Sequence, residues 1–341
     1  MLGAFLHPHT HLFLGFCSAS KSLEFRDSMS QSLKLSIVTP SYNTGAYLAP
    51  AIESVLDQDW PGTEYWVMDG GSTDNSIEVL QRAGSRVKWV SEKDKGQSDA
   101  INKGFARATG DVFSWLNSDD TYLPGAFRAA MEFLQANPDV DMVYGDANYI
   151  DARGNLIGKC VHIEPYNKHR LFHYSDFIVQ PATFFRRRAF EAVGGVDVSI
   201  HWAMDYDLWL KMAGKFKIAY LPRVLANFRW LADNKTATGS FGRLDEIERI
   251  TARYGVALPA YNRLERVNLH LQAAAAELKQ AKILCSGASF ARAVGNVLIC
   301  PRAMWSLFHP LTWKIIWTGQ VLRRRAIRAD QAYLQQQKTA Q

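Results

Sequence analysis

The segment 112–121, VFSWLNSDDT, constrains the fold of this chain more than any other stretch. Its apolar run predicts a short strand covered on both faces, and the run ends in two adjacent carboxylates, Asp119 and Asp120. Two like charges side by side repel, so one of them should have a raised pKa unless a cation lies between them. A hard divalent ion, Mg²⁺ or Mn²⁺, suits such oxygen ligands. The alternative is a solvated turn in which an Asp caps a helix.

Three more predicted strands precede this one, and each is followed by a helical pattern. The strand and helix ranges, in order, are 35–39 with 47–57, 63–68 with 76–82, and 87–91 with 98–107. This alternation predicts an α/β fold with a mostly parallel sheet, which binds ligands beyond the carboxyl ends of its strands. A Pro-Ser-Tyr turn or an acidic residue follows every one of these ends: Pro40 with Tyr42, Asp69, Asp94, and the Asp119–Asp120 pair. We therefore expect them to meet at one edge of the sheet, which disfavours the solvated turn.

The motifs of several other ligand classes are missing. The sequence has no GxGxxG after the first predicted strand, no GxxxxGK[ST] and no GxSxG, which argues against dinucleotide binding, a P-loop and a serine hydrolase elbow. Acidic residues with a tyrosine suit a ribose and a base, and a divalent ion suits a diphosphate. A nucleotide that carries a diphosphate is therefore the expected ligand, with Mg²⁺ or Mn²⁺ as the cofactor.

Four motifs, in this order and spacing, resemble those of family 2 glycosyltransferases. They are 36–43 (SIVTPSYN), 67–76 (VMDGGSTDNS), 94–104 (DKGQSDAINKG) and 110–120 (GDVFSWLNSDD). The resemblance covers about residues 34 to 230. It implies the GT-A nucleotide-diphospho-sugar transferase fold, a mostly parallel sheet flanked by helices, and transfer of a sugar from a nucleotide donor.

The same resemblance implies roles for individual residues. Those expected to hold the donor nucleotide are Pro40, Tyr42, Asn43, Asp69 and Asp99, with Ser72, Lys95 and Asn102 as weaker candidates. Asp120 would bind the metal, and Asp119 would face the ribose or the sugar. Gln180, at a polar break in the apolar run 177–185, would lie on the acceptor side.

The segment 203–212, AMDYDLWLKM, is expected to carry the general base. Its spacing predicts a helix with Leu208, Trp209 and Met212 toward the core and Asp205 in the first turn. Family 2 enzymes place their base here, within a Glu-Asp pair, and this chain has Met204 in place of the Glu. Asp205 keeps the position of the base, but a neighbouring negative charge is missing. One displacement with one base implies inversion at the anomeric carbon.

The end of the matching region departs from the family in a second way. Many relatives carry a His just after the Arg-containing segment, whereas no His directly follows residues 221–231 here. Metal binding is then expected to be weak, or Asn234 and Lys235 take over part of the role. No Gln-x-x-Arg-Trp segment is present, which favours transfer of a single sugar over processive polymer synthesis.

Positive charge gathers in the C-terminal part. Residues 278–329 contain nine Lys and Arg and no Asp or Glu, and tryptophans are interleaved with the arginines. This composition suits an amphipathic surface on anionic lipids, and the alternative is a helical cap on the catalytic domain. Nucleic acid binding is not expected.

The predicted parts are an N-terminal extension (1–33), a catalytic domain (34–242), a helical basic and aromatic region (243–330) and a tail (331–341).

The remaining features concern location and alternatives. The four cysteines have no metal spacing, which fits a reducing cytosol, and residues 1–20 make a poor signal peptide, with Met29 as an alternative start. The expected location is cytoplasmic or peripheral on the inner membrane face, with a lipid-linked or surface-polysaccharide glycan as acceptor. Two alternatives stay open: a nucleotidyltransferase, disfavoured because SYNTG is no basic triphosphate loop, and a catalytically silent membrane scaffold of the same fold, suggested by Met204 and the missing His.

Overall fold

The computed structural model describes residues 33–231, 235–238 and 240–279, with 288–289, 291–292 and 294. The predicted N-terminal extension up to residue 32, the aromatic and basic stretch around 304–328 and the predicted tail all lie outside the described residues.

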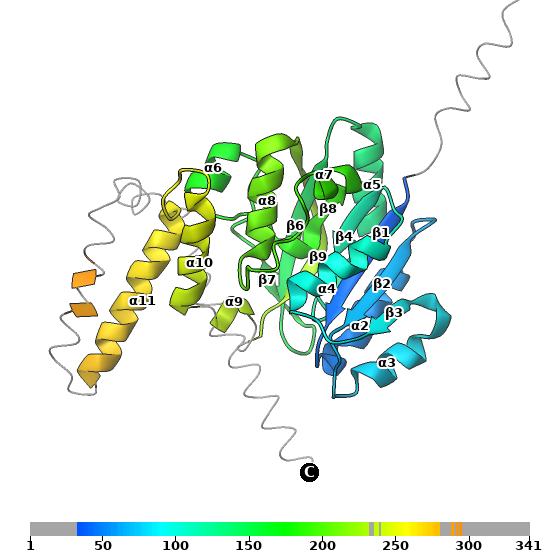
Figure 1. Cartoon of the computed structure of the whole chain (residues 1–341), viewed down its shortest axis with the longest axis horizontal. Helices are drawn as coiled ribbons and strands as arrows, with labels where there is room; N and C mark the ends of the chain where they lie inside the picture. The colour runs from blue at the N-terminus through cyan, green and yellow to red at the C-terminus, as the bar shows by residue number, and fades with distance from the viewer. Residues whose placement is uncertain are drawn as a thin grey trace, which may run out of the picture. The chain divides into compact units, whose positions relative to one another are not determined.

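The first half of the catalytic region forms the predicted parallel sheet (Figure 1). Its strands are β1 (Leu35–Ser41), β2 (Glu64–Asp69), β3 (Lys88–Ser91) and β4 (Val112–Trp115). They pair in parallel in the order β3-β2-β1-β4. Helices link them in turn: α2 (Gly45–Leu56), α3 (Ser76–Ala83) with η1 (Gly84–Arg86), and α4 (Gln97–Arg107). The α/β prediction is confirmed, and the carboxyl ends of these four strands lie at one edge of the sheet.

The second half extends the same sheet with mixed strand directions. Strand β8 (Thr183–Arg186) runs antiparallel between β4 and β6 (Met142–Ile150), and β9 (Ile218–Arg229) is parallel to β6. Two short strands, β5 (Thr121–Tyr122) and β7 (Leu156–Lys159), pair antiparallel with β9 and β6, which makes nine strands within the described residues. The helices of this half are α5 (Ala126–Ala136), α6 (Lys168–His173), η2 (Gln180–Ala182), α7 (Arg187–Ala192) and α8 (Met204–Lys215).

Strand β1 is longer than its sequence predicts. It was expected to stop before Pro40, because proline has no N–H for the ladder. In the structure Pro40 aligns with Met68 and Ser41 with Asp69, whereas pairing with β4 ends at Val38. The side of β1 that faces β4 is therefore unpaired at Pro40, and the missing N–H costs no ladder bond.

Neighbouring phenylalanines on β8 show that helices cover both faces of the sheet. Phe184 packs edge-on against Phe127 of α5, with ring centroids 5.9 Å apart. Phe185 points the other way, to Phe105 of α4 at 5.9 Å and Trp209 of α8 at 6.1 Å. Successive side chains of a strand alternate between faces, so each face needs its own apolar layer.

Helix α4 lies unusually close to the sheet. A Cβ atom on Gly104 would come within 2.5 Å of the Val38 side chain and 3.1 Å of Met68. Glycine is therefore required where α4 crosses β1 and β2, and it sets the distance between the helix and the sheet.

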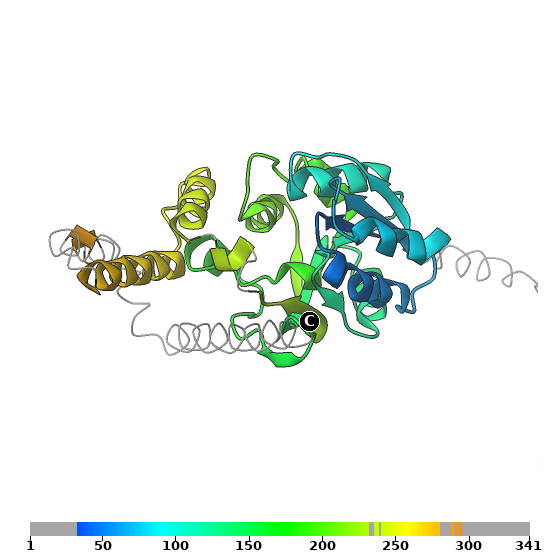
Figure 2. The same ribbon diagram turned by 90° about the horizontal axis from the view of Figure 1, so that it is seen from below.

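Three helices follow the sheet: α9 (Lys235–Thr238), α10 (Ser240–Ala252) and α11 (Ala260–Lys279). The last two lie largely within the region 243–330 that the sequence predicts to be helical. They lie side by side (yellow in Figures 1 and 2), joined by ion pairs of Arg243 with Glu265 and of Arg266 with Glu248. Within the part of the chain that is described, no helix is long and apolar enough to cross a membrane. The predicted domain boundary at residue 243 stays a prediction.

Candidate active site

A cavity of about 930 Å³ opens where the strands of the parallel sheet end. The first four strands contribute to its wall through the segments that follow them. Its lining residues include Pro40, Tyr42, Asn43, Gly70, Gly71, Lys93, Asp94, Gln97, Asn117, Asp119, His201, Leu231 and Lys235. The predicted convergence of strand ends is therefore found, although Asp69 and Asp120 lie behind the wall and do not line it.

The two carboxylates after β4 have different surroundings. Asp119 lines the cavity, whereas Asp120 is 1% exposed and accepts hydrogen bonds from the Arg229 N–H at 2.8 Å and the Asn117 amide at 3.2 Å. Burial, and secondly the charge of Asp119, raise the pKa of Asp120 well above its usual range. A raised pKa at one of the pair is what the adjacent charges predicted.

Arg229, the last residue of β9, fixes the loop that carries this pair. Its guanidinium donates to the carbonyl oxygens of Asp119 (2.7 Å), Asp151 (2.7 Å) and Ala152 (3.1 Å). The residue is 3% exposed, and its backbone N–H holds Asp120. Arg229 lies 109 positions from Asp120, so no local sequence pattern connects the two residues.

At the nucleotide end, Tyr42 and Asn43 follow β1. Tyr42 is 61% exposed and lines the cavity, so its ring is available for stacking. Asn43 has φ 52° and joins two loops: its N–H donates to Ser72 Oγ at 2.8 Å, and its Oδ1 accepts the Thr73 N–H at 2.8 Å. Ser72, a weaker candidate, therefore helps to shape the loop after β2.

Asp69 organises that loop from within. The carboxylate is 2% exposed and accepts the N–H groups of Gly71 (3.1 Å) and Ser72 (3.0 Å) and the Ser91 hydroxyl (2.7 Å). Asp94, at the end of the neighbouring strand, lines the cavity instead. Direct contact of Asp69 with the nucleotide stays a prediction, and its observed contacts are those of a residue that shapes the binding loop.

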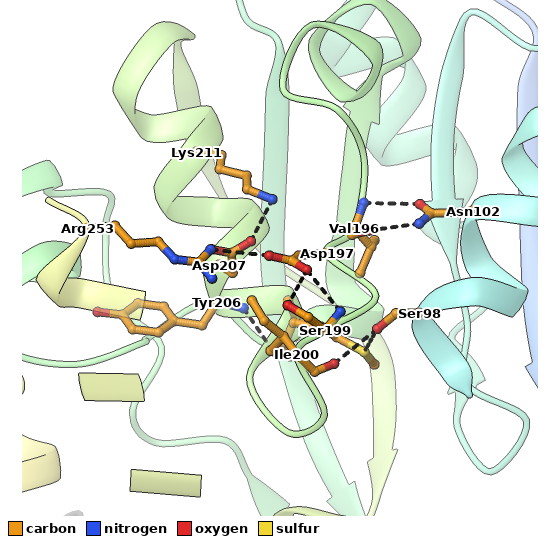
Figure 3. Close-up of polar contacts among 12 residues, drawn as sticks. Ser98, Asn102, Val196, Asp197, Ser199, Ile200, Tyr206, Asp207, Lys211 and Arg253 are labelled. Carbon is orange, nitrogen blue, oxygen red and sulfur yellow. Dashed lines mark hydrogen bonds and ion pairs between the residues drawn. The ribbon is translucent and has the colours of Figure 1, made fainter. Parts of the chain in front are cut away.

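Two predicted residues of α4 have contacts away from the cavity. Asp99 accepts the Lys95 N–H at 3.0 Å and pairs with Lys103 at 3.3 Å, and these contacts lower the pKa of Asp99. Asn102 exchanges two hydrogen bonds with the backbone of Val196, at 2.7 and 3.1 Å, which joins α4 to the 194–197 turn (Figure 3). Neither side chain lines the described cavity, and a nucleotide contact of Asp99 remains a prediction.

Gln180 lies under the loop after β4. It is 6% exposed, donates to the Trp115 carbonyl at 2.7 Å and accepts from the Asn117 amide at 3.1 Å. The Asn117 side chain in turn accepts from Gln97 at 2.7 Å. Gln180 thus supports the segment that carries Asp119, and its predicted acceptor-side role is untested.

Helix α8 presents Asp205 in its first turn, as predicted, with Leu208, Trp209 and Met212 fully buried. Burial raises the pKa of the half-buried Asp205. A second carboxylate lies near it: the charge of Asp205, after burial, raises the pKa of Asp176 well above its usual range.

Position 204, where the family resemblance predicted a Glu, is occupied by a core residue. Met204 is 6% exposed, and its sulfur accepts a hydrogen bond from Ser98 Oγ at 2.9 Å. Its side chain is therefore part of the core and not of the cavity wall. The second carboxyl group near Asp205 is therefore Asp176, from the segment between α6 and η2, and not a residue at position 204.

Two residues that follow β9 line the cavity in the region where the family resemblance predicted a His. Leu231 and Lys235 both line the cavity after β9, and Lys235 Nζ donates to the His201 carbonyl at 3.2 Å. Asn234, the other residue expected to take over, lies outside the described residues. Lys235 therefore brings a positive charge to the wall that also holds Asp119.

The sheet order and the cavity beyond the strand ends are those of the GT-A fold. Comparisons with known proteins agree. Residues 36–194 match the family described as Glycosyl transferase family 2. Residues 36–194 therefore form a glycosyl transferase family 2 domain.

The chain is similar to chondroitin synthase from Escherichia coli, with 32% identity over 188 residues. The match covers 54% of this chain but spans only 27% of that protein's length. The fold of the present chain is similar to that of S. aureus TarS 1–349 in complex with UDP-GlcNAc. The identity is 15%, the TM-score is 0.55, and the match covers 88% of this chain and 92% of that one. The fold is also similar to that of the mannosyltransferase PcManGT from Pyrobaculum calidifontis in complex with GDP-Man and Mn²⁺ (18% identity, TM-score 0.54, 87% of each chain).

Proposed function

We propose that this protein transfers a single sugar, with inversion, from a nucleoside-diphosphate sugar to an acceptor hydroxyl. The observation that carries the proposal is the cavity itself, which joins Tyr42, Asp94 and Asp119 from three strand ends. Tyr42 can stack on the base, and Asp119 lies on the same wall. The UDP-GlcNAc and GDP-Man in the two similar structures support a uridine or guanosine donor.

Asp205 is the general base in this proposal. It takes the proton of the acceptor hydroxyl while that oxygen attacks the anomeric carbon. The bond from the anomeric carbon to the diphosphate breaks, and the nucleoside diphosphate leaves with the electron pair. A single displacement of this kind inverts the anomeric configuration. Burial of Asp205 supports the role, because a raised pKa brings a carboxylate closer to the strength that a base needs at neutral pH.

Asp120, with Asp119, would hold the divalent metal. The described residues contain no group of three or more His, Cys, Asp or Glu that could bind an ion by themselves. The donor set therefore fits Mg²⁺ or Mn²⁺ only if oxygens of the diphosphate complete the coordination, as is usual for Mg²⁺. When bound, the metal stabilises the negative charge that develops on the leaving diphosphate. Lys235 would add a second positive charge on the same wall.

The acceptor is proposed to be a lipid-linked or surface-polysaccharide glycan. Similarity to a protein named chondroitin synthase supports a glycan acceptor. We also propose that the protein acts at the inner face of the cytoplasmic membrane, to which its basic C-terminal region would bind. The alternative is a catalytically silent scaffold of the same fold, and the observation in its favour is Leu231 at the cavity wall where relatives carry a His.

The test is hydrolysis of a panel of UDP-, GDP- and dTDP-sugars by the purified full-length protein, with Mn²⁺, with Mg²⁺ and with EDTA. We expect slow release of one nucleoside diphosphate that stops in EDTA and returns with metal. Full activity in EDTA would contradict the metal assignment alone. Absence of hydrolysis of every donor, together with no binding of UDP, GDP or dTDP by calorimetry, would overturn the transferase proposal and favour the scaffold.

A further inference from the structure

Glu246, in the middle of α10, binds three consecutive backbone N–H groups of a distant loop. Its carboxylate accepts the N–H of His201 at 2.6 Å, of Trp202 at 2.6 Å and of Ala203 at 3.1 Å. The side chain is 3% exposed, so the contact is shielded from water. A buried carboxylate is costly unless its oxygens are hydrogen-bonded, and these three donors meet that need.

The loop that Glu246 holds leads directly into the helix of the proposed base. Ala203 is the N-cap residue of α8 and makes no capping bond with its own side chain. The N–H groups at the start of a helix lack partners within it and need an outside acceptor. Glu246 supplies that acceptor from another helix at Ala203, two residues before Asp205.

The same loop also forms part of the cavity wall. His201 lines the cavity, and its carbonyl accepts a hydrogen bond from Lys235, which lines the cavity as well. The segment 201–203 therefore lies between the donor cavity and α10, held through its N–H groups by Glu246 and through one carbonyl by Lys235.

A second set of contacts fixes α10 against α8 (Figure 3). Arg253 lies 3.2 Å from the fully buried Asp207 and 3.3 Å from Asp197, and Lys211 lies 2.7 Å from the other oxygen of Asp207. Arg253, the residue after the end of α10, thus ties that end of the helix to α8, and Glu246 ties α10 to the loop before α8. A shift of the loop relative to α10 would break the Glu246 bonds while the Arg253 contacts keep the two helices together.

We propose that Glu246 is a positioning residue for sugar transfer. By holding the N–H groups of residues 201–203, it fixes where α8 begins and hence where Asp205 stands relative to the acceptor hydroxyl. The inference rests on the proposed function, because it takes Asp205 as the base. Reacting groups must be held closely, and a misplacement of about 1 Å can cost about 100-fold in rate.

The test compares Glu246→Gln with Glu248→Gln in the full-length protein. Glu248 lies on the same helix, is a more exposed side chain and pairs with Arg266, not with the loop. We measure kcat and KM for hydrolysis of the nucleotide sugar selected by the donor panel. The stoichiometry of UDP or GDP binding by calorimetry counts the intact sites, and all assays run well below the unfolding midpoint.

We expect Glu246→Gln to lower kcat by about 10-fold to 100-fold while KM for the donor and the binding stoichiometry stay near those of the wild type. Hydrogen exchange at residues 201–203 should become faster in this variant. Glu248→Gln should behave as the wild type. Glu246→Asp keeps the acceptor charge on a shorter side chain and should recover part of the lost kcat, and it serves as the second variant if the Gln protein folds poorly.

Two results would overturn the inference. One is a Glu246→Gln protein with wild-type kcat. The other is a fall in kcat that only matches a fall in binding stoichiometry in both Glu246 variants, since that would mean a loss of folded protein. Failure of the proposed function looks different: either the wild type hydrolyses no donor, or Asp205→Asn is as active as the wild type whatever Glu246 does.

Discussion

Asp69 and Glu246 are both buried carboxylates that accept backbone N–H groups, yet they act over very different distances in the sequence. Asp69 binds N–H groups two and three residues further on, within the motif that carries it. Glu246 binds N–H groups 43 to 45 positions away. The loop after β2, on the donor side, is therefore shaped in part from within its own motif, whereas the base side depends on a helix that follows the whole sheet.

This difference predicts how the two sides respond to substitution. Changes on the donor side should weaken binding of the nucleotide sugar and leave the chemical step nearly intact. Changes on the base side should lower kcat with little effect on donor binding. The following predictions test this division, starting with the largest expected effect.

Asp205→Asn should lower kcat for donor hydrolysis by about 100-fold to 10,000-fold, because the base is lost, with donor binding retained. Asp176→Asn is the matched control. Because the pKa of Asp176 is raised well above its usual range, Asp176 keeps its proton while Asp205 is charged, and Asn resembles a protonated carboxyl group. Steady-state kinetics should therefore show Asp176→Asn within about 3-fold of the wild type. Equal losses in both variants would contradict the assignment of the base to Asp205.

The pH dependence of kcat should show the raised pKa of Asp205. Asp205 accepts a proton only when charged, so kcat should fall about tenfold for each pH unit below that pKa, at a pH above the ordinary 3.8. Stability should change in the opposite direction. The folded state binds this proton more tightly, so the contribution of Asp205 to the free energy of unfolding is present at low pH and is lost as pH rises through its folded pKa. An acidic limb at the ordinary carboxyl value would contradict the prediction.

Asp69→Asn should raise KM for the donor by about tenfold and leave kcat close to that of the wild type. The amide keeps the size of the side chain but cannot accept all the N–H and hydroxyl donors that Asp69 binds, and a buried group without its partner costs about 1–3 kcal/mol. Asp111→Asn is the control, because Asp111 accepts the Lys34 N–H at 2.9 Å where β4 begins. A loss of kcat with unchanged KM would break the division between the two sides.

Tyr42→Ala should have the smallest effect, a rise in KM for the donor of about 2-fold to 10-fold. An aromatic stacking contact contributes about 0.5–1.5 kcal/mol. Leu156→Ala is a suitable control, because Leu156 is 67% exposed and does not line the described cavity. Kinetics with the preferred nucleotide sugar would show the difference, and equal KM values for both variants would argue against stacking on Tyr42.

The difference between contacts close in sequence and contacts between distant elements also explains which parts of the fold and of the site could be predicted from the sequence. The strands and helices of the parallel sheet, the cavity at their ends and the position of Asp205 follow from local patterns, because each depends on residues close together in the chain. Arg229, Asp176 and Glu246 were not identified, because their partners lie on elements that only the fold brings together. The roles predicted for Asp69, Asp99 and Gln180 came from motif position, which does not tell whether a side chain faces the cavity or supports its wall.

The short distance between Gly104 and Val38 also has a consequence for donor size. Gln97 and Ala100, near the start of α4, line the cavity, and Gln97 lies seven residues, about 10 Å along the helix, from Gly104. Because residue 104 has no side chain, α4 can lie close to β1 and β2. The position of the helix in turn sets the distance from Gln97 and Ala100 to the opposite wall of the cavity. In directed evolution toward larger or smaller sugars, a substitution of Gly104 would change the width of the cavity although residue 104 does not touch the substrate.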